Sequence, residues 1–442
     1  MVSCGFLNTL EESLKEGKVT EEQINAACRR VLEAKYKLGL FSDPYKYCDT
    51  LRVEKELYTT AHRAVARKIA AETFVLLKNE DHLLPLERKG KIALIGPMAD
   101  ARNNMCGMWS MTCTPSRHGT LLEGIRSAAG DKAEILYARG SNIYHDAELE
   151  KGGAGIRPLE RGNELQLLDE ALHTAARADV IVAALGECAE MSGESASRTE
   201  LGVPDAQQDL LKALVKTGKP VVLLLFTGRP LVLNWEDANV HSILNVWFGG
   251  SETGDAIADV LFGKVTPGGK LTTTFPRSVG QLPLYYNHLN TGRPDPDSHS
   301  FNRYSSNYLD MSNEPLYPFG YGLSYTNFSY GNLQLSSDVL SKNGELTVSV
   351  TVTNDGDFDG YEIVQMYLHD IYAEISRPVK ELKGFERIFL KKGESREVKF
   401  VITEDDLRFY NSGLQYVYEP GEFDVMVGAN SRDVQTERFR AD

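Results

Sequence analysis

The spacing of hydrophobic positions changes character twice along the chain. In the first 45 residues, apolar side chains recur at intervals of three, four and seven, which predicts amphipathic helices. From residue 91 to 262, short apolar runs alternate with helical patterns, and from 333 onward apolar and polar residues alternate with period two. Alternating strands and helices are typical of a mostly parallel sheet that is covered on both faces. The pattern therefore predicts an α/β sandwich followed by an all-β sandwich, with a short helical part in front.

The same pattern predicts individual elements. In the α/β part, the expected strands are residues 91–96, 133–137, 179–185, 220–226 and 242–247, and the expected helices are residues 120–129, 164–176, 204–216 and 254–262. In the β part, the expected strands are residues 345–353, 362–368, 396–402 and 422–427. Near the N-terminus, Thr20 and Gln23 have the spacing of a capping box, which predicts that a helix begins there.

Shifts in composition divide the chain into five segments. Residues 264–330 are rich in glycine, proline, asparagine and serine, but their many aromatic residues argue against disorder. The expected segments are helices in 1–45, a helical linker in 46–88, the α/β sandwich in 89–276, an extended linker in 277–332 and the β-sandwich in 333–442.

One loop stands out because of its length and its charges. Residues 187–203 connect a predicted buried strand to a helix, where loops of roughly 2–6 residues are usual. The carboxyl end of a strand in an open parallel sheet is where ligands bind. Glu194, between Gly193 and Ser195, is the candidate general acid for cleavage of a glycosidic bond. The alternative is a solvated glutamate that Arg198 holds in place.

The other carboxylates of this loop are weaker candidates. We expect Glu187, at the end of the strand, to cap or pair structurally, and Glu190 to be solvated. A second loop carries Trp109 and Ser110 after the first strand of the sheet. Trp109 could form the wall of a sugar subsite, because sugars stack on aromatic rings, or it could lie half-buried under a loop.

The net charge and the absence of long apolar stretches disfavour several classes of partner. The 442 residues carry a formal net charge of −14 and no long basic run, which disfavours nucleic acid and anionic membranes as partners and suits a neutral substrate. No apolar stretch approaches the roughly 20 residues of a membrane span. The N-terminus lacks the features of a signal peptide, so the chain as it stands is expected to be cytoplasmic.

Neither a metal nor a cofactor is expected from the sequence. The six cysteines are Cys4, Cys28, Cys48, Cys106, Cys113 and Cys188. They form no CxxC pair and are too sparse for a disulfide framework, and none has zinc spacing with a histidine. His62, His82 and His118 are interpreted as surface or capping residues. The dinucleotide pattern G-x-G-x-x-G is absent from the first strand of the sheet, and the nucleophile pattern G-x-S-x-G is absent from the chain.

Several stretches, taken in order, resemble glycoside hydrolase family 3, which contains β-glucosidases and β-xylosidases, and especially its three-domain bacterial members. The resemblance covers essentially the whole chain. It rests on residues 31–41, 74–79, 84–86, 92–97, 193–199, 246–250, 267–276, 317–325, 352–356 and 360–367.

The resemblance implies a retaining β-glycosidase that hydrolyses terminal non-reducing β-D-glucosyl residues without a cofactor. In this family a (β/α)8 barrel supplies an aspartate nucleophile, an α/β sandwich supplies the glutamate acid/base, and a fibronectin type III-like domain follows. By position in the motif of residues 193–199, Glu194 looks like the acid/base. Trp109 matches a position that lines the outer sugar subsite in some members, and Ser110 and Arg198 are further candidates for substrate contact.

The chain departs from the family in one large respect. Residues 1–45 match only the last helices of the barrel, and the nucleophile segment is absent; Asp43 lies after the barrel and is not its equivalent. We therefore expect the chain alone to be inactive, and to need either the barrel or a separately encoded half. A β-linked oligosaccharide or aryl glucoside is the expected substrate, and the uncovered apolar helices are expected to favour a homo-oligomer.

Two alternatives remain open at this stage. The chain could be one half of a split enzyme, or a non-catalytic module that binds carbohydrate or a partner and keeps both sandwiches as a scaffold. Full-length members of this type are expected in the periplasm or outside the cell.

Overall fold

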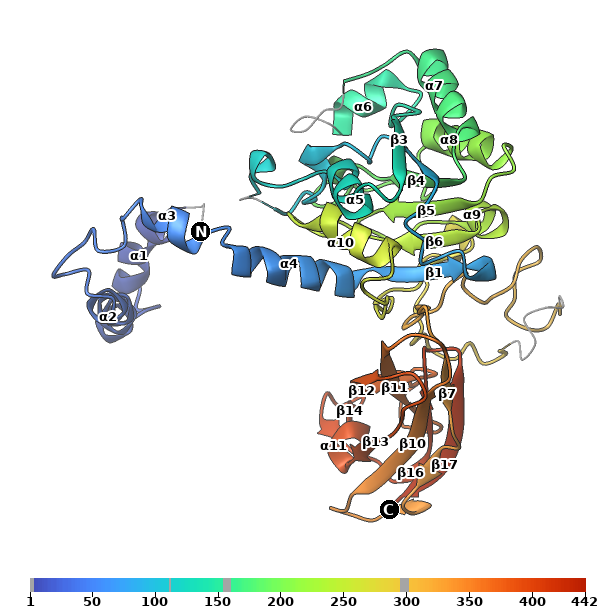
Figure 1. Ribbon diagram of the computed structural model, residues 1–442. Helices are drawn as coiled ribbons and strands as arrows, with labels where there is room; N and C mark the ends of the chain where they lie inside the picture. The colour runs from blue at the N-terminus through green and yellow to red at the C-terminus, as the bar shows by residue number, and fades with distance from the viewer. Residues whose placement is uncertain (1–3, 111–112, 154–159, 295–301) are drawn as a thin grey trace. The chain divides into compact units, whose positions relative to one another are not determined.

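The computed structural model describes residues 4–110, 113–153, 160–294 and 302–442, and Figure 1 shows it as a ribbon. The chain divides into two compact units between Arg63 and Ala64, within helix α4 (Thr60–Thr73). No helix in the described ranges has both the length and the apolar character that crossing a membrane requires.

The first unit consists of short helices and the turns between them. Its helices are α1 (Gly5–Lys15), α2 (Glu21–Lys37) and α3 (Arg52–Glu56). Thr20 and Gln23 form the predicted capping box, since the Gln23 amide donates to the Thr20 hydroxyl and the Thr20 amide donates to the Gln23 side chain. No residue of α1 or α2 is buried, so the apolar positions of these helices close no core within this unit.

The second unit begins with a six-stranded sheet in the order β1-β6-β5-β4-β2-β3. All neighbours in it are parallel except β1, which runs antiparallel to β6. The strands are β1 (Val75–Asn79), β2 (Lys91–Ile95), β3 (Glu134–Ala138), β4 (Val180–Gly186), β5 (Val221–Phe226) and β6 (Ser242–Asn245). The sheet thus includes β1, which lies in the segment 46–88 that the sequence assigns to a helical linker.

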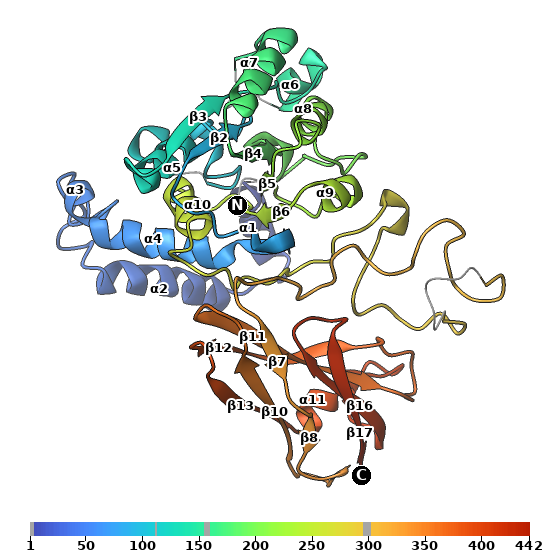
Figure 2. The ribbon, with the colours of Figure 1, turned by 45° about the vertical axis from the view of Figure 1, so that its right-hand side comes forward.

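Helices cover both faces of this sheet, as predicted (Figures 1 and 2). Along β4, Ile181, Ala183 and Leu185 point into one core with α7 and α8, whereas Val182 and Ala184 point into the other with α4, α5 and α10. This alternation explains the continuous apolar run of the strand. The helices are α5 (Leu121–Ala129), α6 (Ala147–Gly153), α7 (Glu164–Ala176), α8 (Asp205–Val215), α9 (Asn234–Asn239) and α10 (Thr253–Leu261), with short 3₁₀ turns η1 (Glu80–His82), η2 (Arg102–Asn104), η3 (Pro115–Arg117), η4 (Ala189–Met191) and η5 (Val279–Gln281).

The strand order contains one point where the direction of winding reverses. From β2 the chain moves outward to β3, then returns to the other side of β2 and continues outward through β4, β5 and β6. In open α/β sheets, the carboxyl ends of the two strands at such a point diverge and leave a crevice where ligands bind. Here those strands are β2 and β4, and the loops that follow them carry Trp109 and Glu194.

The C-terminal part is a β-sandwich, as expected. One sheet joins β13, β10 and β7, with β8 also paired to β10, and the other has the order β12-β11-β16-β17-β9. The core between them contains alternate residues of the long strands, such as Val348, Val350 and Val352. The elements are β7 (Phe328–Tyr330), β8 (Gln334–Leu335), β9 (Val339–Leu340), β10 (Leu346–Asn354), β11 (Gly360–Asp370), β12 (Glu381–Leu390), β13 (Ser395–Ile402), α11 (Glu404–Leu407), β14 (Phe409–Tyr410), β15 (Tyr416–Val417), β16 (Gly421–Gly428) and β17 (Val434–Ala441).

Residues 317–325, late in the expected linker, are fixed to the α/β sheet. The hydroxyls of Tyr317, Tyr321 and Tyr325 donate to Asp237 Oδ1, Leu77 O and Val260 O at 2.6, 3.2 and 2.9 Å. In the same segment, the Gly320 carbonyl accepts a hydrogen bond from Gln365 of β11 at 3.1 Å. The segment therefore joins the sheet to the β-sandwich instead of spanning loosely between them.

Helices α5 and α10 meet at Gly124 and Gly254, and we predict that a side chain at this contact destabilises the fold. A Cβ placed on Gly124 would lie 2.5 Å from the carbonyl carbon and oxygen of Gly254. Although alanine is the better helix former by about 1 kcal/mol, Gly124→Ala is expected to destabilise the fold by about 1–3 kcal/mol through overpacking. The measurement is the midpoint of urea unfolding. Gly202→Ala is the matched control, because no atom lies within 4 Å of its new Cβ, and an equal midpoint for both variants would contradict the prediction.

Candidate active site

The loop after β4 is shaped by a buried carboxylate. Glu187 is completely buried, and its Oε1 accepts a hydrogen bond from Arg198 Nη1 at 2.9 Å and lies 3.0 Å from Arg229 Nε. Its Oε2 accepts from the Thr227 hydroxyl at 2.9 Å and the Gly228 amide at 3.0 Å. A buried charge is tolerated only when it is paired and hydrogen-bonded, and Glu187 meets both conditions. The expected structural role of Glu187 is consistent with this geometry.

The two arginines also hold the loop by its backbone. Arg198 donates to the Gly202 carbonyl at 3.1 Å, and Arg229 donates to the Ala196 carbonyl at 2.7 Å and to the Met191 carbonyl. These contacts draw the loop against the turn that follows β5. Arg198 is therefore engaged with Glu187 and the loop backbone. The alternative in which Arg198 holds Glu194 in place is wrong.

Glu194 lies at the exposed part of the same loop. Its side chain is exposed and makes no hydrogen bond or ion pair with any residue that the structure describes. The neighbouring backbone is unusual, since Gly193 has φ +108° and Ser195 has φ +60°. The prediction that Glu190 is solvated is wrong, because both of its carboxylate oxygens are buried. Of the three carboxylates in residues 186–199, Glu194 is thus the one presented to solvent without a partner.

The loop after β2 lies against the loop that carries Glu194. A Cβ on Gly193 would lie 3.1 Å from Met108 Cγ and 3.3 Å from Trp109 Nε1. The buried Asn104 accepts a hydrogen bond from the Ala189 amide at 2.8 Å and so ties the start of one loop to the start of the other. Because position 193 has no side chain, the indole can approach the backbone next to Glu194.

Trp109 is 71% exposed, so it is not the half-buried residue that the sequence allowed as an alternative. Its ring is available for stacking against the apolar face of a sugar. Ser110 lies beside it, and its hydroxyl donates to the Gly107 carbonyl at 2.7 Å. The structure brings Trp109 and Ser110 to the same edge of the sheet as Glu194, while Arg198 lies deeper and 13% of its side chain is exposed.

The cysteines and His118 differ from the expectation. Cys106 and Cys113 form a disulfide, and four other cysteines are free. His118 is 4% exposed, so its interpretation as a surface or capping residue is wrong. Its Nε2 lies 3.4 Å from Cys113 Sγ and 3.7 Å from Cys106 Sγ. The spacing C-x6-C-x4-H is the signal in the sequence, and it is not a zinc spacing that short motifs describe.

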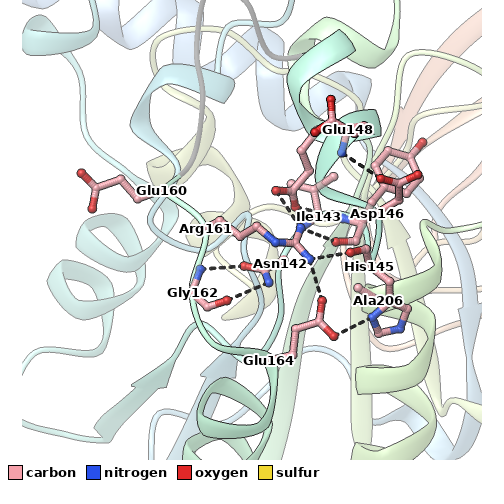
Figure 3. A network of polar contacts seen from close by, with 12 residues as sticks. Asn142, Ile143, His145, Asp146, Glu148, Glu160, Arg161, Gly162, Glu164 and Ala206 are labelled. Atoms are coloured by element: carbon pink, nitrogen blue, oxygen red, sulfur yellow. Dashed lines mark hydrogen bonds and ion pairs between the residues drawn. The ribbon is translucent and has the colours of Figure 1, made fainter.

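A second polar cluster is formed by residues 142–150, residues 160–164 and the start of α8 (Figure 3). Arg161 contacts Glu150 at 3.0 Å and Glu164 at 2.7 Å and donates to the Tyr144 carbonyl at 2.9 Å. His145 lies between Glu164, at 3.0 Å, and Asp209, at 3.2 Å. The charged groups of this cluster satisfy one another, so its geometry is that of a structural tie between a loop and two helices.

The chain is similar to known proteins over most of its length. Residues 74–325 match the model of the glycosyl hydrolase family 3 C-terminal domain, and residues 362–431 match that of the fibronectin type III-like domain. The chain is 46% identical to a periplasmic β-glucosidase of Salmonella typhimurium, over 96% of this chain and 56% of that protein. It is 38% identical to a β-xylosidase of Formosa agariphila, with the same two coverages.

The solved structures with a similar fold include β-glucosidases. The fold superposes on a crystal structure of a β-glucosidase from Listeria innocua in complex with isofagomine, with a TM-score of 0.87 and 37% sequence identity. That match covers 100% of this chain and 58% of the other. The chain spans about half the length of the curated relatives it matches.

The Glu187 cluster yields a prediction about stability. Glu187→Gln leaves two arginines facing a neutral group in a buried position, and breaking such a pair is expected to cost about 3–5 kcal/mol in the free energy of unfolding. Glu194→Gln removes a carboxylate of the same loop that has no partner, and should change stability by no more than about 0.5 kcal/mol. Urea unfolding of both variants checks this. Equal stability of the two variants would show that the cluster does not hold the loop.

The position of His145 yields a prediction about pH. Burial lowers the pKa of His145, but hydrogen bonds to Asp209 and Glu164 outweigh it and raise the pKa above its ordinary value. The imidazolium therefore stabilises the fold below about pH 6.5, and this contribution is lost as the pH rises through the raised pKa. NMR titration should show Asp209→Asn lowering the pKa of His145. Asp169 lies next to the exposed His173, and Asp169→Asn should leave the pKa of His145 unchanged. A similar shift of this pKa in both variants would count against the pairing of His145 with Asp209.

Proposed function

Since the chain belongs to glycoside hydrolase family 3, we propose that Glu194 is the general acid/base of a retaining, β-glucosidase-like reaction. The observation that carries the proposal is the position of this carboxylate. It is exposed and unpartnered among the described residues, on the loop after β4, at the reversal point of a parallel sheet. Ligands bind at such points in open α/β sheets. Glu187 is unsuited to the role, because proton transfer would disrupt its four contacts.

The proposed chemistry uses two carboxyl groups. In a retaining glycosidase, an acid protonates the leaving oxygen while a carboxylate about 5–5.5 Å away attacks the anomeric carbon; the first group then activates water. Glu194 would take the first role. We propose that a group outside the described residues takes the second role. Asp43 is not assigned to it, because Asp43 lies in a turn after α2 and accepts a hydrogen bond from the Tyr45 amide at 3.0 Å.

The sugar would be positioned next to Glu194 by the loop after β2. Trp109, beside Gly193, would stack on the sugar that forms the leaving group, and Ser110 would contribute a hydroxyl. Arg198 would act on the sugar only through its N–H groups that are not used on Glu187 and Gly202. A β-linked oligosaccharide or an aryl β-glucoside is the proposed substrate.

A general acid alone accelerates a reaction by only about 10²–10⁴-fold, and it needs a nucleophile and a positioned sugar to do so. We therefore propose that these 442 residues hydrolyse glycosides at trace rates by themselves. Activity would require a barrel that supplies the aspartate, either in the same polypeptide or as a separate half.

A second candidate is a sugar-binding function without catalysis. The large exposed fraction of Trp109 favours it, because an exposed ring suits binding to a sugar whether or not chemistry follows. The two candidates differ in what a barrel adds: the acid/base role predicts rescue of hydrolysis, and the binding role predicts affinity without rescue.

The test measures hydrolysis of an aryl β-glucoside by the chain alone and by the chain mixed with the separately produced barrel half of a similar β-glucosidase. We expect trace activity alone and recovery in the mixture. Glu194→Gln should reduce the recovered kcat/KM by about 10²–10⁴-fold. Glu200→Gln, an exposed carboxylate in the same loop, is the matched control and should retain activity.

Each outcome has a distinct meaning. Ordinary glycosidase turnover by the chain alone, abolished by Glu194→Gln, would refute the inactivity of the chain but support the acid/base role. Recovered activity that is insensitive to Glu194→Gln would refute the acid/base role. Calorimetric binding of cellobiose that Trp109→Ala abolishes, together with no recovery, would favour the binding module.

A further inference from the structure

Cys106, Cys113 and His118 bring together three donors that suit a soft metal ion. The two Sγ atoms and His118 Nε2 lie within 4.8 Å of one another. His118 is buried, and the cysteines are partly exposed. Thiolate and imidazole are the preferred ligands of Zn²⁺ and similar ions. The three residues come from the segment between β2 and α5, and none belongs to the Glu187 cluster.

The ring of His118 is oriented as in a metal ligand. Its Nδ1 lies 3.3 Å from the Gly119 carbonyl oxygen. When Nδ1 carries the proton and donates it to this carbonyl, the lone pair of Nε2 points toward the sulfurs. A histidine that binds a metal through one nitrogen typically donates its other N–H to a carbonyl or carboxylate in this way. The Arg102 guanidinium donates to the His118 carbonyl and fixes the backbone at this residue.

The separations between His118 Nε2 and the two sulfurs fit a tetrahedral ion. With Zn–S of about 2.3 Å and Zn–N of about 2.0–2.1 Å, a tetrahedral site separates S and N by about 3.5 Å. The observed separations from Nε2 are 3.4 and 3.7 Å. Two thiolates on one zinc lie about 3.8 Å apart, so the disulfide must open before the ion binds. The Cα atoms of the two cysteines are 6.4 Å apart, which leaves room for that separation.

We propose that Cys106, Cys113 and His118 form a redox-gated site for a soft divalent metal ion of the Zn²⁺ class, with water as the fourth ligand. A dithiol reductant transfers two electrons and two protons to the disulfide, whose S–S bond breaks to give two thiols, and the reductant becomes a disulfide. The ion then forms bonds to both sulfurs and to Nε2, and two thiol protons pass to solvent.

The site would act on the segment that carries Trp109. The disulfide joins residues on both sides of this tryptophan, and an ion bound to the same sulfurs would join them again. The reduced chain without metal has neither link. Metal would therefore replace the disulfide as the constraint on Trp109 under reducing conditions, and this holds whether or not Glu194 is the acid/base.

The test uses Co²⁺, whose thiolate complexes absorb in the visible and near ultraviolet and which binds more weakly than Zn²⁺. The full chain carries Cys4→Ser, Cys28→Ser and Cys48→Ser, because these exposed thiols would bind metal unspecifically. Cys188 is kept, since burial raises the pKa of its thiol to about 12 and holds it as a thiol. The protein is reduced with a phosphine under nitrogen and titrated with Co²⁺.

We expect one tetrahedral cobalt spectrum per chain in the reduced protein, its displacement by Zn²⁺, and no such spectrum in the oxidised protein. Cys106→Ser and Cys113→Ser should each abolish the thiolate bands. Loss of a residue that only hydrogen-bonds to a metal ligand typically weakens metal binding by roughly 10–100-fold, and His118→Gln should weaken Co²⁺ binding by more than that. His173 is exposed, and His173→Gln should leave the affinity for Co²⁺ unchanged.

Three results would overturn the proposal. They are no cobalt spectrum in the reduced chain, unchanged bands after Cys106→Ser or Cys113→Ser, or equal affinity in the two histidine variants. Circular dichroism melts of each variant show whether it is folded. The comparison of oxidised with reduced protein needs no further substitution, so the proposal stays testable even if a variant fails to fold.

Discussion

The burial of one charge at Glu187 is the constraint on which the arrangement at the edge of the sheet depends. A carboxylate with no exposed surface needs counter-charges. Glu187 pairs with Arg198 of its own loop and with Arg229 of the turn after the next strand. Both arginines then use their remaining donors on the backbone of the loop. Satisfying one buried group thereby folds a long segment against the sheet, and its far part remains in solvent with Glu194. A loop of this length without such an anchor would have to order itself at a large cost in conformational entropy.

The exposed residues of the candidate site are supported by buried neighbours instead of by one another. Glu194 follows a glycine that leaves space for the Trp109 indole, and the two loops are tied together beneath by Asn104 and the Ala189 amide. The side chains with proposed chemical roles therefore carry few contacts of their own. This division is typical of sites in which a rigid scaffold presents groups from loops.

The fold was largely predictable because its signals are local. The apolar run that became β4, the alternation that became β10 and the capping box at Thr20 are each read within about ten residues. The antiparallel edge strand β1 was placed in a linker, since only its partner β6, far along the chain, makes it part of the sheet. Glu194 was singled out by the length and charge of its loop and then by the family motif. Its exposure agrees both with a general acid and with a solvated glutamate, although Arg198 does not hold it.

The remaining details of the site depend on contacts that no local pattern encodes. Arg229 lies 42 positions after Glu187, and nothing in the sequence around either residue indicates that the two form an ion pair. His118 resembles any other isolated histidine until the fold buries it against two sulfurs. Glu190, between two carboxylates of very different surroundings, shows that the order of residues along a loop does not indicate which of them reach solvent.

The three tyrosine hydroxyls of residues 317–325 bear on how chimeras of such proteins should be assembled. Because these hydroxyls bond to Asp237, Leu77 and Val260, the segment belongs physically to the α/β sandwich, although it follows a long glycine- and proline-rich stretch. A recombination junction inside that stretch would pair the tyrosine donors of one parent with the hydrogen-bond acceptors of the other. A crossover after Tyr325 keeps the donors and acceptors together, and leaves the Gln365 contact with the Gly320 carbonyl as a bond that the incoming β-sandwich has to supply.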